Sequence, residues 1–300
     1  MKKKILLLFL FAAFAAFPQK NREKMNETIA TLFVLDLTYA ELPLDFLPSL
    51  EKRQKLKIKS VEKISSQNYS LDEGDEPLEG VEPTAMVFAF EFDNNGRVSK
   101  FTYTDKRFDN KITENLINYD KNGFFSGFTR KVTDLSGEVL KTANFKPLFE
   151  GNRLSEIVRV DDKAAPIPNS TLYTFEYRPD GSLKNALFRE TSANYYFDEE
   201  ERISKIHRIN PINFYYDKSG NLVQQKGWSN LDEDHELWNS DYNYDKEGNL
   251  LSSSTTSPYL EEEYNYTLGA NGLPVEARYK VVAEDGTEGI NFEFRYTYRK

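Results

Sequence analysis

Apolar residues recur along most of the chain in pairs spaced two positions apart, and a short polar turn follows each pair. Six turns are clear: they read DNNG, DKNG, RPDG, DEEE, DKSG and DKEG, and begin at residues 93, 120, 178, 198, 217 and 245. The pairs before them are Phe90/Phe92, Ile117/Tyr119, Phe175/Tyr177, Tyr195/Phe197, Phe214/Tyr216 and Tyr242/Tyr244. A spacing of two places both side chains on one face of a β-strand. The pattern predicts consecutive β-hairpins over residues 86–299.

The residues around each turn predict its geometry. With a three-residue loop, Tyr216 faces Leu222 across the hairpin, so that an apolar residue meets an apolar residue. Asp217 can accept a backbone N–H within the turn, and Gly220 can take the positive φ that a side chain opposes. The DEEE copy has Glu201 in place of the glycine, so its turn is expected to be strained or of another type.

The polar residues between the apolar ones predict a second, hydrated face of the sheet. Its expected cross-strand partners are Glu91/Ser99, Asn118/Ser126 and Glu176/Lys184. Two strands per turn give roughly sixteen or seventeen strands, too many for a flat open sheet. We therefore expect an all-β antiparallel meander of hairpin repeats, curled into a barrel or coiled sheet. A short N-terminal segment of mixed structure precedes it, in which residues 27–41 fit a helix or a buried strand pair.

The first residues are typical of a secretory signal peptide. MKKK precedes an apolar run that ends in small residues, which predicts cleavage after Ala15 or Ala16; a retained membrane anchor is the alternative. The predicted organisation is a signal peptide (1–16), an N-terminal segment with an acidic linker (17–84) and a β-repeat domain (85–300). Loss of the three leading lysines takes the net charge from −9 to −12.

Composition narrows the classes of function. An acidic surface repels phosphate backbones, so nucleic acid is an improbable partner. The chain has no cysteine, which excludes disulfides, zinc-thiolate sites and cysteine nucleophiles. Beyond the signal segment no apolar run is long enough to predict an integral membrane span.

Candidate catalytic chemistry is sparse. The two histidines, His207 and His235, do not share a metal-binding spacing, and no hydrolase or phosphate-loop motif is present. The run at 261–263 could supply a carboxylate pair for glycoside hydrolysis, although a charged strand face is the preferred interpretation. The sequence therefore assigns no catalytic residue, metal ligand or cofactor.

The two tryptophans are the best candidates for ligand contacts. Trp228 and Trp238 flank the polar stretch SNLDEDHEL, so strands that pair around its centre would place the indoles nearly opposite each other. A cross-strand packing pair is the preferred interpretation. The alternative is a ligand-gripping loop, in which Trp228, Trp238, Asp232 and Asp234 are the ligand-binding residues and a glycan or protein is the partner.

Two copies of the repeat carry a family resemblance. Tyr216-Asp217-Lys218-Ser219-Gly220-Asn221-Leu222 and Tyr244-Asp245-Lys246-Glu247-Gly248-Asn249-Leu250 resemble YD repeats, also called RHS-type repeats. Large members of that family wind a β-sheet into a hollow shell around a toxin domain, which this chain is too short to copy. The chain also resembles small secreted bacterial repeat proteins of unknown function with a porin-like fold. Neither resemblance implies catalytic residues.

Together these observations favour an exported, non-enzymatic binding or scaffolding protein of the bacterial cell envelope or surface. The predicted location is the periplasm, the cell surface or the medium. A secreted carbohydrate-active enzyme is the alternative. An outer-membrane β-barrel is the third reading, and it is disfavoured by 29% charged residues and by an end at Arg299-Lys300 in place of a terminal aromatic residue.

Overall fold

The computed structural model describes residues 23–36, 47–70, 76–77, 86–105, 109–232, 235–283 and 286–300. The expected signal peptide and most of the acidic linker lie outside these ranges. A helix covers residues 23–36. The other elements are α2 (Leu50–Lys55), β1 (Ile58–Ser70), β2 (Glu76–Pro77), β3 (Met86–Phe92), β4 (Val98–Asp105), β5 (Asp109–Tyr119), β6 (Phe125–Asp134), β7 (Val139–Glu150), β8 (Arg153–Val160), β9 (Pro166–Tyr177), β10 (Leu183–Phe188), β11 (Ala193–Phe197), β12 (Ile203–His207), β13 (Pro211–Tyr216), β14 (Leu222–Trp228), β15 (Glu236–Tyr244), β16 (Leu250–Thr256), β17 (Leu260–Leu268), β18 (Pro274–Ala283) and β19 (Gly286–Tyr298).

The strands form one antiparallel meander that closes on itself. From β3 to β19 each strand pairs with the next along the chain, and β1 pairs with both β3 and β19. The described sheet has nineteen strands; all but the two-residue β2, which pairs with the end of β1, form the closed ring. The predicted all-β barrel of hairpins is confirmed. The ring also includes β1, which lies in the segment that the sequence places before the repeats.

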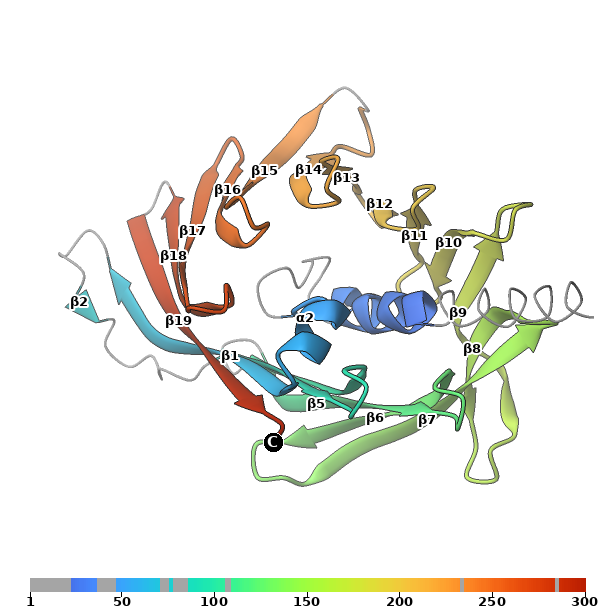
Figure 1. Ribbon diagram of the computed structural model, residues 1–300. Helices are drawn as coiled ribbons and strands as arrows, with labels where there is room; N and C mark the ends of the chain where they lie inside the picture. Colours follow the sequence, from blue (N-terminus) through green and yellow to red (C-terminus); the bar gives the residue numbers. More distant parts are fainter. Residues whose placement is uncertain are drawn as a thin grey trace, which may run out of the picture.

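A helical plug occupies the interior of the barrel. We use this name for the helix over residues 23–36 together with α2, around which the strands are arranged (Figure 1). Residues 27–36, which fitted two secondary structures, are therefore helical. From Ile29 onward the described part of the helix is almost fully buried; its buried apolar residues are Ile29, Ala30, Leu32, Phe33, Val34 and Leu35. The Phe33 ring lies 4.3 Å from that of Phe128 and 6.0 Å from that of Tyr173.

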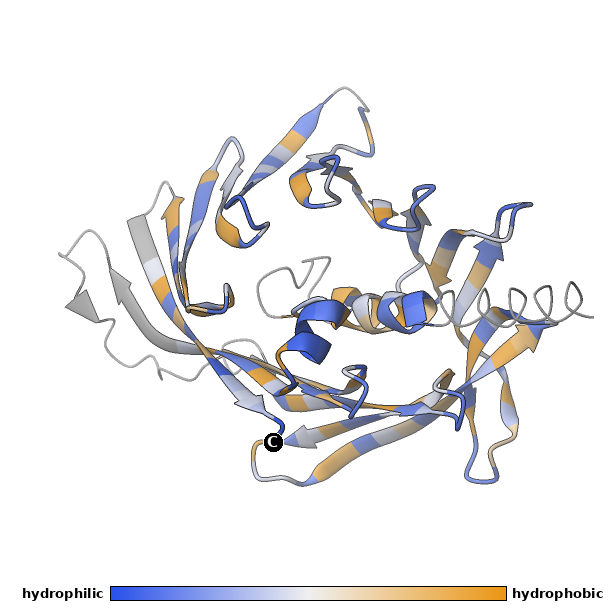
Figure 2. Ribbon diagram, viewed as in Figure 1, coloured by the Kyte–Doolittle hydropathy of each residue, from blue (hydrophilic) through white to orange (hydrophobic). Residues whose placement is uncertain are grey.

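The two faces of the wall differ in chemistry. Apolar and polar residues alternate along the strands (Figure 2), and the inward rows, such as Phe88, Phe90 and Phe92, are buried. Ion pairs join neighbouring strands on the outward face: Lys100 to Glu91 (3.4 Å) and Glu114 (2.7 Å), and Lys184 to Glu176 (3.7 Å). The core therefore lies between the inward rows and the plug, and the outer face is charged.

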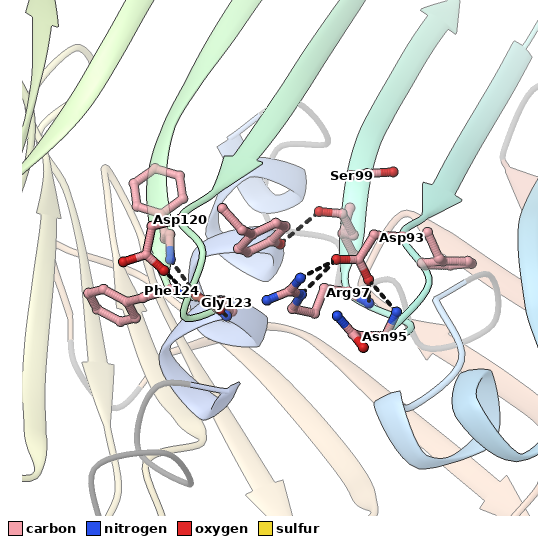
Figure 3. Close-up of polar contacts among 12 residues, drawn as sticks. Asp93, Asn95, Arg97, Ser99, Asp120, Gly123 and Phe124 are labelled. Carbon is pink, nitrogen blue, oxygen red and sulfur yellow. Dashed lines mark hydrogen bonds and ion pairs between the residues drawn. The ribbon is translucent and has the colours of Figure 1, made fainter.

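The turns have the predicted geometry. As expected for Tyr216 and Leu222, the second residue of each apolar pair faces the apolar residue six positions later, across the turn. The six facing pairs are Phe92–Val98, Tyr119–Phe125, Tyr177–Leu183, Phe197–Ile203, Tyr216–Leu222 and Tyr244–Leu250. Asp217 donates its N–H to the Asn221 carbonyl (2.9 Å), and its carboxylate accepts N–H bonds from Ser219 (2.8 Å) and Asn221 (2.9 Å). Gly220 has a φ of +88°. The Asp93 and Asp120 carboxylates bend back onto their own turns in the same way (Figure 3).

Beyond the turn, whose left-handed residue was expected to form a bulge, each of these hairpins contains a further bulge that the sequence pattern did not predict. Phe92 faces Val98, but the next pair is Glu91 with Lys100, which leaves Ser99 as an extra residue. The expected partners Glu91/Ser99, Asn118/Ser126 and Glu176/Lys184 are therefore wrong by one position, because Asn118 faces Gly127 and Glu176 faces Asn185. A bulge bends its strand and increases the local twist. Its repetition around the sheet favours closure into a barrel.

The conformation of Glu201 decides between the two expectations for the DEEE turn, a strained turn or a turn of another type. The turn is of the same type as the others, since Asp198 and Glu201 make the same backbone hydrogen bonds, and Glu201 takes a φ of +57°. A non-glycine residue in this region is strained. Its carboxylate accepts a bond from the Leu183 N–H (2.6 Å) and lies 3.0 Å from the Lys24 ammonium on the plug.

Replacing Gly220 by valine should destabilise the protein by about 1–2 kcal/mol more than replacing Ser219 by valine, because only position 220 needs the left-handed conformation. A Cβ at Gly220 would meet no atom closer than 3.8 Å, so the effect isolates backbone strain. Urea denaturation of both variants measures the difference. Equal midpoints with unchanged slopes would contradict the turn model.

Candidate functional site

The motif tyrosines join successive hairpins at one end of the barrel. The hydroxyl of each donates to a backbone carbonyl of the preceding hairpin: Tyr119 to Val98 (2.7 Å), Tyr177 to Leu154, Tyr216 to Ile203 and Tyr244 to Leu222 (each 2.8 Å). Burial raises the pKa of all four hydroxyls, that of Tyr244 to about 12. They remain protonated donors at neutral pH, and they fix the spacing of the turns.

The side chain directly after the left-handed turn residue differs between repeats. Arg97 lies over the Tyr119 ring at 4.4 Å, and Arg202 lies over the Tyr216 ring at the same distance. Asn221 and Asn249 occupy the equivalent positions in later repeats, where they bond to the turn carboxylates at 3.0 and 2.7 Å. An amide side chain is shorter than a guanidinium side chain, so this sector of the wall is less filled.

The plug is bonded to the same turns. Asn26 donates to the Gly123 carbonyl (2.9 Å) and accepts the Phe125 N–H (3.1 Å). From α2, Gln54 donates to the Asn95 carbonyl (2.8 Å) and Lys52 to the Asn249 side-chain oxygen (2.6 Å). The turns therefore hold both helices at this end of the barrel.

A crevice of about 560 Å³ separates the plug from the turns of four consecutive hairpins. The plug contributes Lys24, Glu27, Thr28 and Thr31, which lie on one face of the helix, together with Ser49 and Lys52. The opposite wall is formed by repeat residues: Phe197, Glu201, Arg202, Ile203, Tyr216, Gly220, Asn221, Leu222, Tyr244, Gly248, Asn249, Leu250, Gly272, Leu273 and Pro274. A volume of this size is typical of small-molecule sites, and the exposed surface of the lining is mostly apolar although several charged and amide side chains border it.

The charged side chains that line the crevice differ in whether they have an ionic partner. Lys24 lies 3.0 Å from Glu201, and Glu27 is paired with the buried Arg53 of α2. Lys52 bonds to an amide oxygen, and burial lowers the pKa of its ammonium group although Asp245 opposes the shift. Among the residues that the structure describes, no ion pair to Lys52 is found. The crevice therefore combines apolar walls with a cation that is available to an anionic group.

The structure separates the two tryptophans that the sequence placed together. Trp238 covers Gly227, whose added Cβ would lie 2.3 Å from the indole nitrogen, on the inward face. Trp228 pairs with Glu236 and lies near Lys226 on the outward face, because a bulge follows the Gly227–Trp238 pair. The indoles therefore cannot grip one ligand between them in this arrangement.

The acidic candidates of the same loop are only partly described. Asp232 lies in the turn, where its carbonyl accepts the His235 N–H at 3.0 Å. Asp234 is outside the described residues. The ligand-binding role of Trp228, Trp238, Asp232 and Asp234 stays a prediction.

A buried polar cluster was missed by the sequence reasoning. Asp36, the last described residue of the plug helix, accepts a hydrogen bond from the Tyr195 hydroxyl (2.6 Å), and the Arg208 guanidinium lies 3.9 Å away. Burial raises the pKa of Asp36 to about 7, against the opposing effects of Tyr195, Arg130 and Arg208. The available signal was an acidic residue directly after the apolar run LFVL. The cluster attaches the last described turn of the helix to the barrel wall.

Two searches of the described residues gave negative results. No group of three or more potential metal-ligating side chains converges in the described ranges. Nor does any helix within them have the length and apolar composition needed to cross a membrane.

Comparison with known proteins gives only distant structural similarity. No protein-family model matches the chain, and neither does any curated protein. A porin-like protein from Bacteroides uniformis is 12% identical with a TM-score of 0.37, and the match covers 81% of this chain and 98% of that one. A porin-like protein from Bacteroides vulgatus is 13% identical with a TM-score of 0.32 and the same coverages. The Photorhabdus luminescens Tc holotoxin pore is 13% identical with a TM-score of 0.32 over 76% of this chain, which spans only 15% of the toxin chain.

Proposed function

We infer that the protein is an exported, non-enzymatic binding or scaffolding protein of the bacterial cell envelope or surface, and that its ligand occupies the crevice beside the plug. The observation that carries this proposal is the crevice itself, with its apolar walls and Lys52. The export part rests on the signal-like sequence of residues 1–16.

The two faces of the wall support a binding role in water over a lipid-facing one. A barrel in a bilayer presents an apolar band to lipid. Here the outward rows of β3–β5 and β9–β10 carry ion pairs between strands, such as Lys100 with Glu114. The inner space is occupied by a helix whose apolar side is packed on the wall.

The acidic run that suggested a glycosidase lies in β17. Glu261 and Glu263 are exposed on the outward face, and Glu262 points inward, where it accepts a hydrogen bond from Tyr279. A glycosidase needs two carboxyl groups on either side of a bound sugar. Glu262 lies on the other side of the wall from Glu261 and Glu263, and these two are neighbours on the exposed face of one strand, which does not place a carboxyl group on each side of a sugar and favours the non-enzymatic reading.

The lining of the crevice indicates the chemical class of its ligand. Leucine, proline and tyrosine side chains supply apolar surface to the wall, and Lys52 lines it without a carboxylate within ion-pair distance among the described residues. An apolar molecule with one anionic group satisfies both features, because its charge would pair with the ammonium group while its body leaves water. We therefore assign a small amphipathic anion to the crevice.

Lys52→Gln should weaken binding of such an anion by about tenfold or more, as expected for the loss of one charge-assisted bond. The probe is 8-anilinonaphthalene-1-sulfonate, followed by its fluorescence, with dodecanoate as competitor. Lys55→Gln is the matched control, because Lys55 is exposed on the same helix and does not line the crevice. Equal affinity in both variants, or no displaceable binding by the wild type, would refute the proposed site.

A further inference from the structure

The outer face of β13, β14 and β15 carries an ordered array of polar and aromatic side chains. Three cross-strand rows follow from the register. Their members are Tyr215, Gln224 and Asp241 in the first row, Asn213, Lys226 and Asn239 in the second, and Trp228 and Glu236 in the third. Phe214 and Gln225, which alternate with these residues, are buried on the inward face. The array thus lies on the opposite side of the wall from the crevice and the plug.

Two aromatic rings mark the ends of this array. Tyr215 is 41% exposed, and Trp228 is partly exposed at the end of β14. Tyr215 faces Gln224, four residues before Trp228, which separates the rings by roughly 13 Å along the strands. Both rings are carried by paired strands, so their separation is fixed by the sheet.

The polar side chains between the rings are held by one another. Asp241 accepts hydrogen bonds from Gln224 (3.0 Å) and Asn239 (2.8 Å), one on each carboxylate oxygen. Lys226 is paired with Glu236 at 2.8 Å and lies near the Trp228 ring. These contacts fix the orientation of the amides, and they leave hydrogen-bonding capacity on Gln224 and Asp241 for further bonds.

We propose that this array is a glycan-binding platform for an uncharged polysaccharide that runs along β14. The apolar faces of sugar rings stack on aromatic rings. Sugar hydroxyl groups both donate and accept hydrogen bonds, so they can bond to the amide and carboxylate side chains that lie between Tyr215 and Trp228. The only cation of the array is already paired with a carboxylate, so a polyanionic glycan finds no free positive charge there. The separation of the rings fits a chain of several sugar units.

A protein partner is the less favoured occupant. The centre of a protein interface is depleted of charged groups and rich in apolar ones. Here the centre contains Gln224, Lys226, Asn239 and Asp241, and the rings lie at its ends. The platform does not depend on the crevice, so either proposal can fail while the other stands.

Affinity electrophoresis in native gels that contain laminarin, xyloglucan or galactomannan tests the platform. The wild type should be retarded by at least one of these neutral polymers. Trp228→Ala and Tyr215→Ala should each weaken that binding by about tenfold or more, from the loss of one stacked ring. Tyr259→Ala is the control and should bind as the wild type does, because Tyr259 is an exposed aromatic residue outside the three rows.

Two further measurements keep the outcome unambiguous. Thermal melting of each variant identifies any loss of folding. In a Trp238→Phe background, Trp228 is the sole tryptophan, and its emission should change on titration with the polymer that retards the protein. The proposal is overturned by an absence of retardation in every neutral polymer, by equal loss in Tyr259→Ala, or by folded Trp228→Ala and Tyr215→Ala proteins that still bind. Retention by an immobilised protein in place of a polysaccharide would assign the surface to a protein partner.

Discussion

Replacing Arg53 by alanine should lower the free energy of unfolding by about 3–5 kcal/mol, the range for breaking a buried ion pair. The Arg53 side chain is fully buried, lies 4.9 Å from the centre of the Phe92 ring and pairs with Glu27 of the long plug helix. Its removal leaves the partly buried Glu27 carboxylate without its ionic partner, and partial burial already raises the pKa of this carboxyl group. Denaturant midpoints at neutral pH measure the cost.

Two comparison variants show whether the charge pair causes the loss. Lys55→Ala removes an exposed cation from the same helix and should change stability by no more than about 0.5 kcal/mol. The double variant Glu27→Gln with Arg53→Met removes both charges and should be more stable than Arg53→Ala, because no buried ion is left unpaired. If Arg53→Ala costs no more than Lys55→Ala, the pair does not anchor the plug.

Asp36→Asn should stabilise the protein at pH 8 and change it little at pH 4. Burial raises the pKa of Asp36 from 3.8 to about 7 in the folded state, so folding favours the protonated carboxyl group. Its stabilising contribution is complete below the unfolded pKa, near pH 4, and is lost as the pH rises through about 7. A shift of this size corresponds to roughly 4 kcal/mol. An asparagine side chain cannot ionise, and its oxygen can still accept the Tyr195 hydroxyl bond.

The difference in unfolding free energy between the variant and the wild type, measured from pH 4 to pH 8, isolates this group from other carboxylates. Glu27 also has a raised pKa, but it contributes equally to both proteins. Arg208 and Arg130 favour the ionised form, whereas Glu190 opposes it. A wild type that is more stable than Asp36→Asn at pH 8 would mean that the arginines outweigh burial and hold Asp36 as a carboxylate.

The hairpins could be predicted from sequence because their determinants are local. In Tyr216–Leu222, an aspartate that bonds to its own turn and a glycine with positive φ specify the loop within seven residues. Alternating apolar residues then select the inward face. The bulges could not be predicted, since residues such as Ser99 and Val223 share no side-chain chemistry that marks them as the extra residue.

The candidate sites depend on contacts between distant segments, which the local pattern does not contain. The crevice lies between the plug helix and repeats in which Asn221 and Asn249 stand where two earlier repeats have Arg97 and Arg202. The tryptophans fell on opposite faces because one extra residue in β15 reverses the alternation. The outer array could be recognised only from the register of β13, β14 and β15, which places Gln224 between Tyr215 and Asp241.

The seam between β1 and β19 determines when the barrel can finish folding. The hydroxyls of Ser60 and Thr297 lie 2.6 Å apart across this seam, although 237 positions separate them in the chain. All other strands of the ring are synthesised before β19, and until it docks, β1 and β18 each keep one unpaired edge. Such edges can pair with other chains, and contacts between distant residues form slowly. The molecule is therefore most exposed to aggregation just before completion, and its yield depends on the rate of this last step more than on the stability of the finished core.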